Sequence, residues 1–220
     1  MAISLSGSAS AQATSITIPS HQVGNVIVIF AGRNNTTPPT TPSGWVQLAS
    51  TGSNNGSSVA AWKIAKTSSE TSGTWTNASV LHCLVLEADT GILYLSTALS
   101  GQAASSATIN YPALANYRSG VVDNWYLAHA FQLNSANSLE TAPSGMANVL
   151  VESSSGSWKS AVHYTTAGQL SNWASTNVVL ANSAFYLSRV LQAIEVDGPA
   201  FGSSGGGLIL PRPMNGGYSA

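Results

Sequence analysis

Charged side chains are scarce in this chain. Of its 220 residues, 7 are Lys or Arg and 8 are Asp or Glu, which is 7% of the total, against roughly 25% in a typical soluble domain. A formal net charge of −1 without a basic run offers nothing to nucleic acid, whose phosphates are neutralised by Lys and Arg. The same scarcity excludes a polybasic membrane patch. We therefore expect neither nucleic acid nor a membrane as a partner.

Cysteine and long apolar runs are also missing. The single cysteine, Cys83, rules out an intramolecular disulfide and disfavours a cysteine-based zinc site. No segment approaches the ~20 apolar residues that a membrane-spanning helix needs. The first ten residues have neither the basic start nor the apolar run of a secretory signal. These absences predict a chain that is made and folded in a cytoplasm.

Small polar residues take the place of charge. Ser, Thr, Asn and Gly together make up about 40% of the chain, while 44% is hydrophobic and six Trp and seven Tyr are present. Aromatic residues in that number supply a core, so the chain is predicted to be folded. A coat rich in Ser, Thr and Asn is typical of extracellular β proteins and assembly subunits. One interpretation is a particle component that is folded inside a cell and used outside it.

Helical periodicity is nearly absent. Short β-branched and aromatic runs alternate with Gly, Asn, Ser and Pro clusters, which is the pattern of a β-sandwich or barrel. Runs such as Asn34–Pro39 and Gly52–Gly56 are typical of turns. The strands expected in the first half are Thr14–Ile18, Asn25–Ala31, Trp45–Ser50, Ser58–Lys66, Gly73–Thr76 and Val80–Ala88.

The second half of the chain repeats the order of the first at a spacing of about 100 residues. Five collinear matches carry this observation, and together they predict an internal duplication with half-repeats at about 14–89 and 108–197. The matched pairs are Asn25–Ala31 with Asn124–Ala130, Pro42–Trp45 with Pro143–Met146, Ala61–Lys63 with Val162–Tyr164, Thr74–Thr76 with Asn172–Ala174, and Leu86–Asp89 with Ile194–Asp197.

The predicted duplication favours one domain over two. A sheet of four or five strands has an apolar face that it must bury, so two halves facing each other would share one core. We expect a single all-β domain over residues 1–197, a jelly-roll-like β-sandwich. Alternation in Asn124–Leu133 supports this, because the larger side chains fall on one face. Edge strands of such a sandwich need protection, which partner subunits would supply.

The character of the sequence changes after Asp197. A glycine-rich tether, Gly198–Gly207, precedes a short apolar peptide, and together they predict an extended Gly/Pro-rich C-terminal arm over residues 198–220. Two interpretations stay open, an arm that docks on a neighbour by strand addition and a frayed terminus. The candidate docking residues are Leu208, Ile209, Leu210, Pro211 and Met214.

Several of these segments together resemble a β-sandwich domain found in virion proteins of tailed bacteriophages. The resemblance covers roughly residues 14–197, and it implies a phage structural protein: a capsid decoration or cement subunit, or a component of tail or fibre. It brings no catalytic signature and no site residues. The chain departs from the pattern at His163-Tyr164 and at Met146. The segments that carry it are Thr40–Val46, Ala61–Ala65, Thr74–Thr76, Leu86–Ala88 and the weaker second round at Ala142–Gly145.

Carboxylates offer two enzymatic hypotheses. Asp89-Thr90-Gly91 is similar to an aspartic-protease loop, but that chemistry needs a second matching carboxylate, and the repeat offers only Asp197-Gly198-Pro199. The pairs Glu87/Asp89 and Glu195/Asp197 have the i, i+2 spacing of residues on one strand face, where they could flank a sugar as glycosidase groups do. Their identical placement in both halves favours a structural position instead.

Other reactive side chains give weaker signals. His82 and Cys83 are adjacent, hence on opposite faces of a strand, and cannot act as a base and nucleophile pair. Cys83 is expected to be a small buried residue. The four histidines, at positions 21, 82, 129 and 163, share no metal-ligand spacing. We predict no catalytic, cofactor-binding or metal-binding residues.

The sequence therefore predicts a non-enzymatic virion structural protein, a capsid decoration or cement subunit assembled in the bacterial host cytoplasm. Its expected partners are major capsid or tail proteins and further copies of itself, as in a trimer. A fibre shaft would need repetitive elongated sequence, which is missing. The alternative is a tail- or fibre-associated module that binds host-surface glycan, with Trp158 in the polar stretch Glu152–Ser160 as the candidate sugar-stacking residue.

Overall fold

Twelve antiparallel strands make up the described part of the protein. The structure is a computed structural model that describes residues 3–53, 56–88, 93–101, 105–116, 124–154, 157–165, 168–169 and 171–195. The first sheet contains β1 (Ile3–Ala11), β2 (Val26–Arg33), β3 (Val46–Ser53), β4 (Gly56–Ile64) and β5 (Val80–Ala88). The second contains β6 (Leu93–Gly101), β8 (Asn124–Gln132), β9 (Met146–Ser154), β10 (Trp158–Thr165) and β12 (Tyr186–Glu195). A small third sheet pairs β7 (Ser106–Tyr111) with β11 (Thr176–Ala184).

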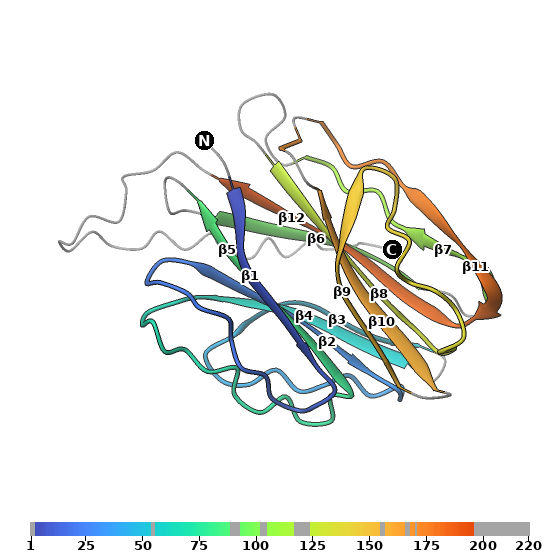
Figure 1. Cartoon of the computed structure of the whole chain (residues 1–220), viewed down its shortest axis with the longest axis horizontal. Coiled ribbons are helices and arrows are strands. Elements are labelled where there is room, and N and C mark those ends of the chain that lie inside the picture. The colour runs from blue at the N-terminus through green and yellow to red at the C-terminus, as the bar shows by residue number, and fades with distance from the viewer. Residues whose placement is uncertain are drawn as a thin grey trace, which may run out of the picture.

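The two large sheets pack face to face, so the predicted all-β sandwich is confirmed (Figure 1). Side chains alternate across each strand, and in β2 this sends Val26, Val28 and Phe30 into the space between the sheets. The second sheet meets them with Trp125 and Leu127 of β8 and with inward residues of β6, β10 and β12. This shared interior is the core that holds the two sheets together.

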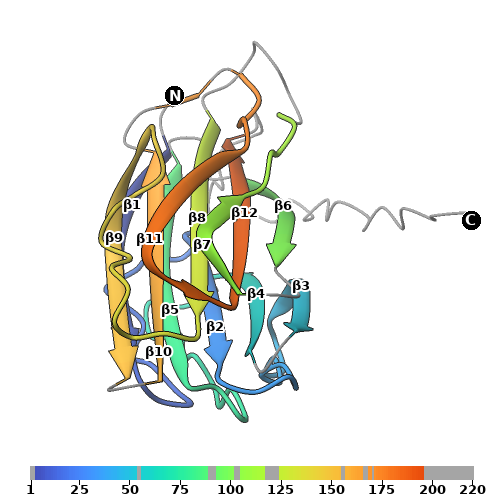
Figure 2. The ribbon, with the colours of Figure 1, turned by 90° about the vertical axis from the view of Figure 1, so that its right-hand side faces the viewer.

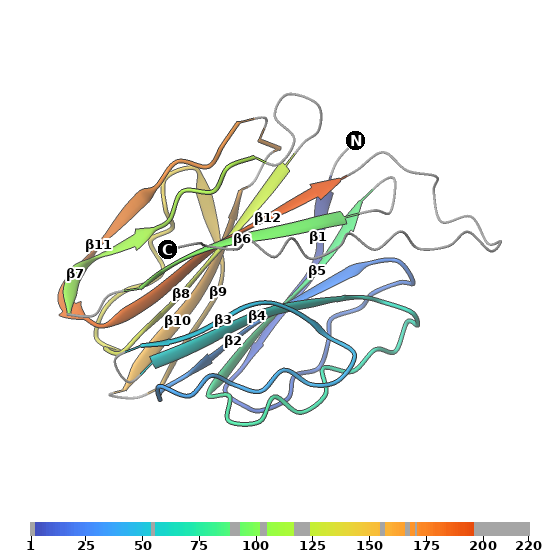
Figure 3. The same cartoon turned by 180° about the vertical axis from the view of Figure 1, so that it is seen from behind.

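Both large sheets have the same strand order. The first reads β1-β5-β2-β4-β3 and the second β6-β12-β8-β10-β9. Counted within its own sheet, each order is 1-5-2-4-3. The chain finishes the first sheet before it starts the second (Figure 3). Its connections therefore differ from those of a jelly roll, where the chain passes repeatedly between the sheets.

The described parts of the segments that suggested a duplication occupy equivalent places in the two sheets or in the turns and loops beside them. The turns before β3 and β9 both have a glycine with positive φ, +86° at Gly44 and +85° at Gly145. The Trp75 amide donates to the Thr14 carbonyl at 2.7 Å, and the Trp173 amide donates to the Leu114 carbonyl at 3.0 Å. The duplication remains a prediction, and these correspondences support it.

Each large sheet begins earlier in the chain than the half-repeat predicted for it. β1 and β6 precede the expected starting points at residues 14 and 108, and each forms an outer strand of its sheet. Four of the six strands expected in the first half match β2 to β5 within a few residues. Thr14–Ile18 and Gly73–Thr76 are not strands; they lie outside the sheets, and Gly73 has a positive φ of +68°. They have strand-like sequences because they cover apolar surface without joining a ladder.

Each large sheet buries both of its faces, whereas the sequence suggested only one apolar face per sheet. On the outer face of the first sheet, Ile27, Ile29 and their neighbours are covered by Ile16, Ile18 and Trp75 from loops. On the outer face of the second sheet lies the small sheet of β7 and β11, which Figure 2 shows as a third layer in front of β8 and β12.

The predicted C-terminal arm, with Leu208, Ile209, Leu210, Pro211 and Met214, lies outside the described residues. Within the described ranges, no helix has the length and hydrophobicity that a membrane crossing requires.

The matched turns lead to a first prediction. In each turn the glycine takes the positive φ of a type II turn, and an added Cβ would meet nothing within 4 Å at Gly44 and only Trp173 at 3.8 Å at Gly145. Gly44→Ala and Gly145→Ala should therefore each lower the free energy of unfolding by a similar ~1–2 kcal/mol, through backbone strain alone. Urea denaturation at pH 7.5 measures this.

Gly56→Ala is the matched control. Its φ lies outside the positive region, and the added Cβ would meet Phe131 at an ordinary 3.5 Å, so this variant should not be destabilised. A difference of several kcal/mol between the two turn variants would contradict the equivalence of the turns.

Candidate functional site

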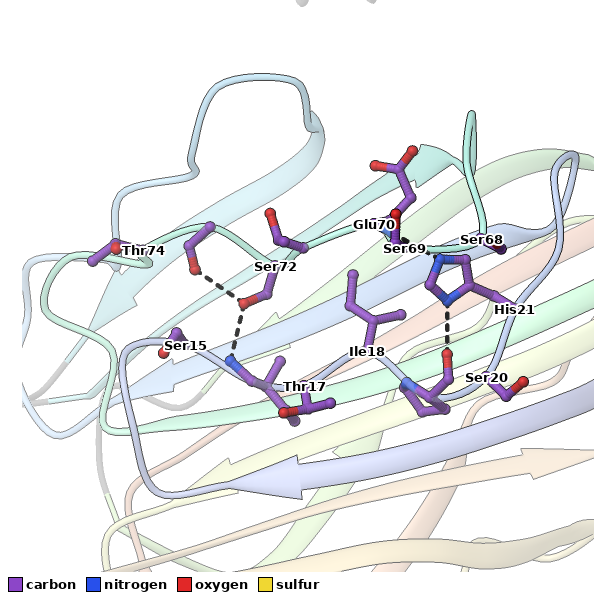
Figure 4. Close-up of a pocket in the computed structure, with 14 residues that line it drawn as sticks. Ser15, Thr17, Ile18, Ser20, His21, Ser68, Ser69, Glu70, Ser72 and Thr74 are labelled. Atoms are coloured by element: carbon purple, nitrogen blue, oxygen red, sulfur yellow. Dashed lines mark hydrogen bonds between the residues drawn. The ribbon is translucent and has the colours of Figure 1, made fainter.

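A groove lies on the outside of the first sheet, among the described residues. It lies between the segments 15–21 and 68–74 and has a volume of about 620 Å³ (Figure 4). Both segments belong to the cover over the apolar outer face of that sheet, with Ile16 and Ile18 pointing inward to the cluster around Ile27 and Trp75. The groove is therefore built on a rigid floor.

Hydrogen bonds hold the two walls together at both ends of the groove. At one end the Trp75 amide donates to the Thr14 carbonyl, and the Ile16 amide donates to the Ser72 hydroxyl at 2.9 Å. At the other end the Glu70 amide donates to Nε2 of His21 at 3.0 Å. Between these points the two walls share no backbone–backbone hydrogen bond. Because side chains bridge the walls, they stand farther apart than paired strands, and this separation creates the groove.

Hydroxyl groups dominate the lining of the groove. Alternation along the first wall turns Ser15 and Thr17 outward, while Ile16 and Ile18, which are 9% and 8% exposed, form the apolar floor. The hydroxyl-bearing residues that line the groove are Ser15, Thr17, Ser20, Ser68, Ser69, Thr71, Ser72 and Thr74.

The two titratable side chains at the groove already have structural partners. His21 contacts the Pro19 carbonyl through Nδ1 at 2.7 Å and accepts a hydrogen bond from the Glu70 amide through Nε2, so both ring nitrogens have a partner. The Glu70 carboxylate accepts from Lys63 Nζ at 2.9 Å and from the Lys66 and Thr67 amides.

These contacts set the charge state of Glu70. The hydrogen bond from Lys63 lowers the pKa of Glu70 to about 2, against the opposing effect of burial and with help from the two amides. Lys63 in turn lies over the ring of Trp45, 4.8 Å from its centroid. The groove therefore offers hydroxyl groups and an already paired carboxylate rather than a free acid or base, and it suits non-covalent binding of an uncharged polar ligand.

A second polar cluster lies in the interior between the two large sheets. Ser160 of β10 contacts Nε2 of His82 at 2.9 Å and Nε2 of His129 at 3.0 Å. A serine next to a histidine is the arrangement of a nucleophile and its base. All three side chains are at most 1% exposed, so a substrate cannot reach the hydroxyl in this structure.

Sequence reasoning missed both places. The histidines showed no common spacing, yet the sandwich brings the rings of His82 and His129 to 5.8 Å between centroids. His163 lies on the other face of the second sheet, 6.0 Å from the ring of Tyr111. Among the described residues, no group of three or more His, Cys, Asp or Glu is arranged to hold a metal ion.

Trp158, the candidate sugar-stacking residue, is only 5% exposed. Its ring packs against Phe131, 5.7 Å between centroids, within a small apolar cluster that includes Val80. The polar sequence around Trp158 suggested an exposed ring, but β10 turns the ring inward. Burial removes the open face that stacking on a sugar requires, so Trp158 does not suit this role in the structure described.

The remaining sequence candidates are dispersed. Cys83 points into the outer cluster of the first sheet, opposite to His82, and burial raises the pKa of its thiol to about 12. Glu87 is exposed and accepts a hydrogen bond from Ser4. Asp89 and Asp197 lie outside the described residues, as does the side chain of Glu195.

Comparison with known proteins gives no relative: no protein-family model, no curated protein and no solved structure shows a significant match to the chain.

Glu70 gives a second prediction. Glu70→Gln should lower the free energy of unfolding by about 1–2 kcal/mol at neutral pH, because the charged hydrogen bonds that organise one wall of the groove are lost. A carboxylate with a lowered pKa stabilises the fold above its unfolded pKa and loses this effect as the pH falls through its folded pKa. The difference between wild type and variant should therefore shrink between pH 4.5 and about 2.

Urea denaturation of both proteins across this range measures the effect. Glu87→Gln is the control, since that exposed carboxylate has one hydroxyl partner, and it should change stability by less than ~0.5 kcal/mol. A Glu70→Gln protein as stable as wild type at pH 7 would show that the carboxylate does not organise the wall.

Proposed function

We propose that the chain is a non-enzymatic structural subunit of a tailed-phage virion, which docks on neighbouring virion proteins as a capsid decoration or cement protein. The observation that carries this proposal is the lack of charge on the strands at the edges of its sheets. The phage assignment itself rests on the sequence resemblance.

Edge strands with free backbone groups invite pairing with other chains, and soluble monomers protect them with Lys, Pro or inward charges. The outer strands of the two large sheets are β1, β3, β6 and β9. They contain neither Lys nor Pro, and their one charged residue is Glu152. Glu152 is occupied, because it accepts from Ser10 at 2.5 Å and from Gln12 at 3.2 Å, both on the neighbouring β1 side.

Strand β3, at the other edge of the first sheet from β1, and the small sheet of β7 and β11 each present an exposed apolar side chain. Val46 of β3 is 51% exposed, and Val179 of β11 is 78% exposed. Neither β11 nor its partner β7 contains a charged residue. Burying such a surface against another protein carries little desolvation cost. A subunit that is packed against neighbours needs less charge for solubility than a free monomer does, which agrees with the composition of the whole chain.

Capsid decoration is favoured over a fibre position because the described part is a layered sandwich rather than an elongated repeat. The proposed partners are major capsid or tail proteins and other copies of this chain. By mass action, a subunit that binds only the assembled shell stabilises it.

The third prediction concerns particles of the phage that encodes the chain. Particles assembled without this protein are incubated with it, and bound protein is measured by sedimentation and by antibody labelling in electron micrographs. We expect label on the capsid and a higher temperature of particle rupture. Label on the tail would overturn the decoration role, and no binding to any part of the particle would overturn the virion role.

Matched variants locate the docking surface. Val46→Lys and Val179→Lys place a charge on strands β3 and β11, and at least one should weaken particle binding tenfold or more while leaving the thermal midpoint of the free protein unchanged. Val23→Lys is the control, because Val23 is 69% exposed but lies in a loop. Equal binding by all three variants would exclude both strands as docking edges.

A glycan-binding module is the second candidate, favoured by the hydroxyl-lined groove. The fourth prediction states its test: a glycan-array signal that Thr17→Val and Thr74→Val abolish, and that the control Thr40→Val outside the groove leaves intact. These substitutions remove exposed hydroxyls at nearly constant shape. A signal that survives both groove variants would separate glycan binding from the groove, and a blank array would remove this candidate.

A further inference from the structure

The interior between the large sheets contains a polar bridge that joins one sheet to the other. His82 belongs to the first sheet and contacts Ser160 of the second at 2.9 Å. Ser58 of the first sheet contacts Nδ1 of His129, on the second, at 3.4 Å. Arg189 of the second sheet donates from Nη2 to the Ser58 carbonyl at 3.3 Å. All five side chains are at most 1% exposed, so these contacts are shielded from bulk solvent.

The hydrogen bonds assign the protons in this bridge. The Ser160 hydroxyl donates to the Ala130 carbonyl at 3.1 Å, which leaves its two lone pairs to accept from Nε2 of His82 and Nε2 of His129. Both rings are then neutral with the proton on Nε2. Nδ1 of His129 accepts from Ser58, and Nδ1 of His82 has no hydrogen-bond partner.

Neither His82 nor His129 can take up a second proton without leaving a hydrogen-bonding group unpaired. Protonated His82 would carry an N–H on Nδ1 without an acceptor, which is costly in a buried site. Protonated His129 would lose the hydrogen bond that its Nδ1 now accepts from Ser58. Its ring also stacks on Phe30 of the first sheet, 5.1 Å between centroids, so added charge would face an aromatic and aliphatic surface.

The charged and titratable groups around the bridge are all cationic or become so. Arg189 of β12 faces it, with Nε and Nη1 lacking any partner, and His163 of β10 lies behind it on the other face of the second sheet. β2 and β4 contribute Phe30 and Ser58. The carboxylates whose side chains are described, Glu70, Glu87, Glu140 and Glu152, make their contacts elsewhere. None of them offsets a charge placed here.

We propose that His82, Ser160 and His129 form an acid-sensitive latch, which holds the two sheets together at neutral pH and releases them when the histidines are protonated. The latch is a property of the fold and does not depend on the proposed virion role.

The direction of the pH effect follows from burial. Burial lowers the pKa of His82 to about 3, with a smaller effect of His163, and holds the pKa of His129 well below its usual value, with His82 and Arg189 adding to the effect. The unfolded chain therefore takes up protons below pH ~6.5 that the folded protein excludes. Folding is fully favoured above that pH and weakens as the pH falls.

The fifth prediction concerns how far the folding equilibrium constant falls as the pH is lowered. Burial also lowers the pKa of His163 to about 4, so three histidines contribute. Between pH 6 and pH 5, where carboxylates titrate only slightly, each excluded proton lowers the folding equilibrium constant roughly 8-fold. From pH 6 to pH 5 the folding equilibrium constant of the wild type should fall roughly 500-fold, because three protons are excluded. That of the double variant His82→Gln/His129→Gln should fall only roughly 8-fold.

Urea denaturation of the full chain at pH 7.5, 6 and 5 measures these constants. His163→Gln, outside the bridge, should still lose roughly 60-fold between pH 6 and 5 by the same arithmetic. A double variant with the full pH dependence of wild type would overturn the latch.

If the double variant does not fold, the pH dependence of the wild-type protein alone tests the proposal. A loss of 10-fold or less between pH 6 and 5 is what a single histidine supplies, and it would overturn the latch. Hydrogen exchange gives the structural readout. After correction for the intrinsic rate, amides of β5 and β8 should lose protection together as the pH falls from 7 to 5, and unchanged protection at pH 5 would also overturn the proposal.

Discussion

The two central strands, β2 and β8, are buried along both faces, and most of the architecture follows from that constraint. Every residue of β8 is buried, as are all but the last of β2. A sandwich covers one face of each sheet, so each outer face needs its own cover. The first sheet obtains it from loop segments and the second from the small sheet of β7 and β11. The groove is a consequence, because the covering segments on the first sheet are bridged by the side chains of Ser72 and His21 rather than by a backbone ladder.

This constraint also explains which elements the sequence predicted. β2 to β5 stand out because their β-branched and aromatic residues alternate over a full strand length. β1, with the sequence ISLSGSASA, escaped prediction because its small polar residues are those of the chain's own loops. Thr14–Ile18 was predicted as a strand for the opposite reason. Ile16 and Ile18 alternate with polar residues as in a strand, but the segment uses that alternation to cover a sheet.

The two polar sites were beyond the reach of sequence reasoning for different physical reasons. The groove is lined by Ser and Thr, the side chains that are commonest throughout the chain, so composition gives no local signal. The bridge joins positions 82, 129 and 160, and their meeting depends on how the two sheets are set against each other. His129 lies on the inward face of β8 with Trp125 and Leu127, yet no pattern within β8 indicates which residue of the first sheet it will meet.

Scarce charge has different consequences at the surface and in the interior. At the surface it leaves edge strands that another protein can cover without removing ions from water. In the interior, the polar groups between the sheets are stable only while they are neutral, except for Arg189, whose guanidinium has no carboxylate partner among the described contacts. The described ion pairs, Lys63–Glu70 and Lys159–Glu140, lie away from this interior. Salt screens exposed charges, and because these are few, it should change the stability of this fold little. Protons, in contrast, act directly on the histidines that join the two large sheets.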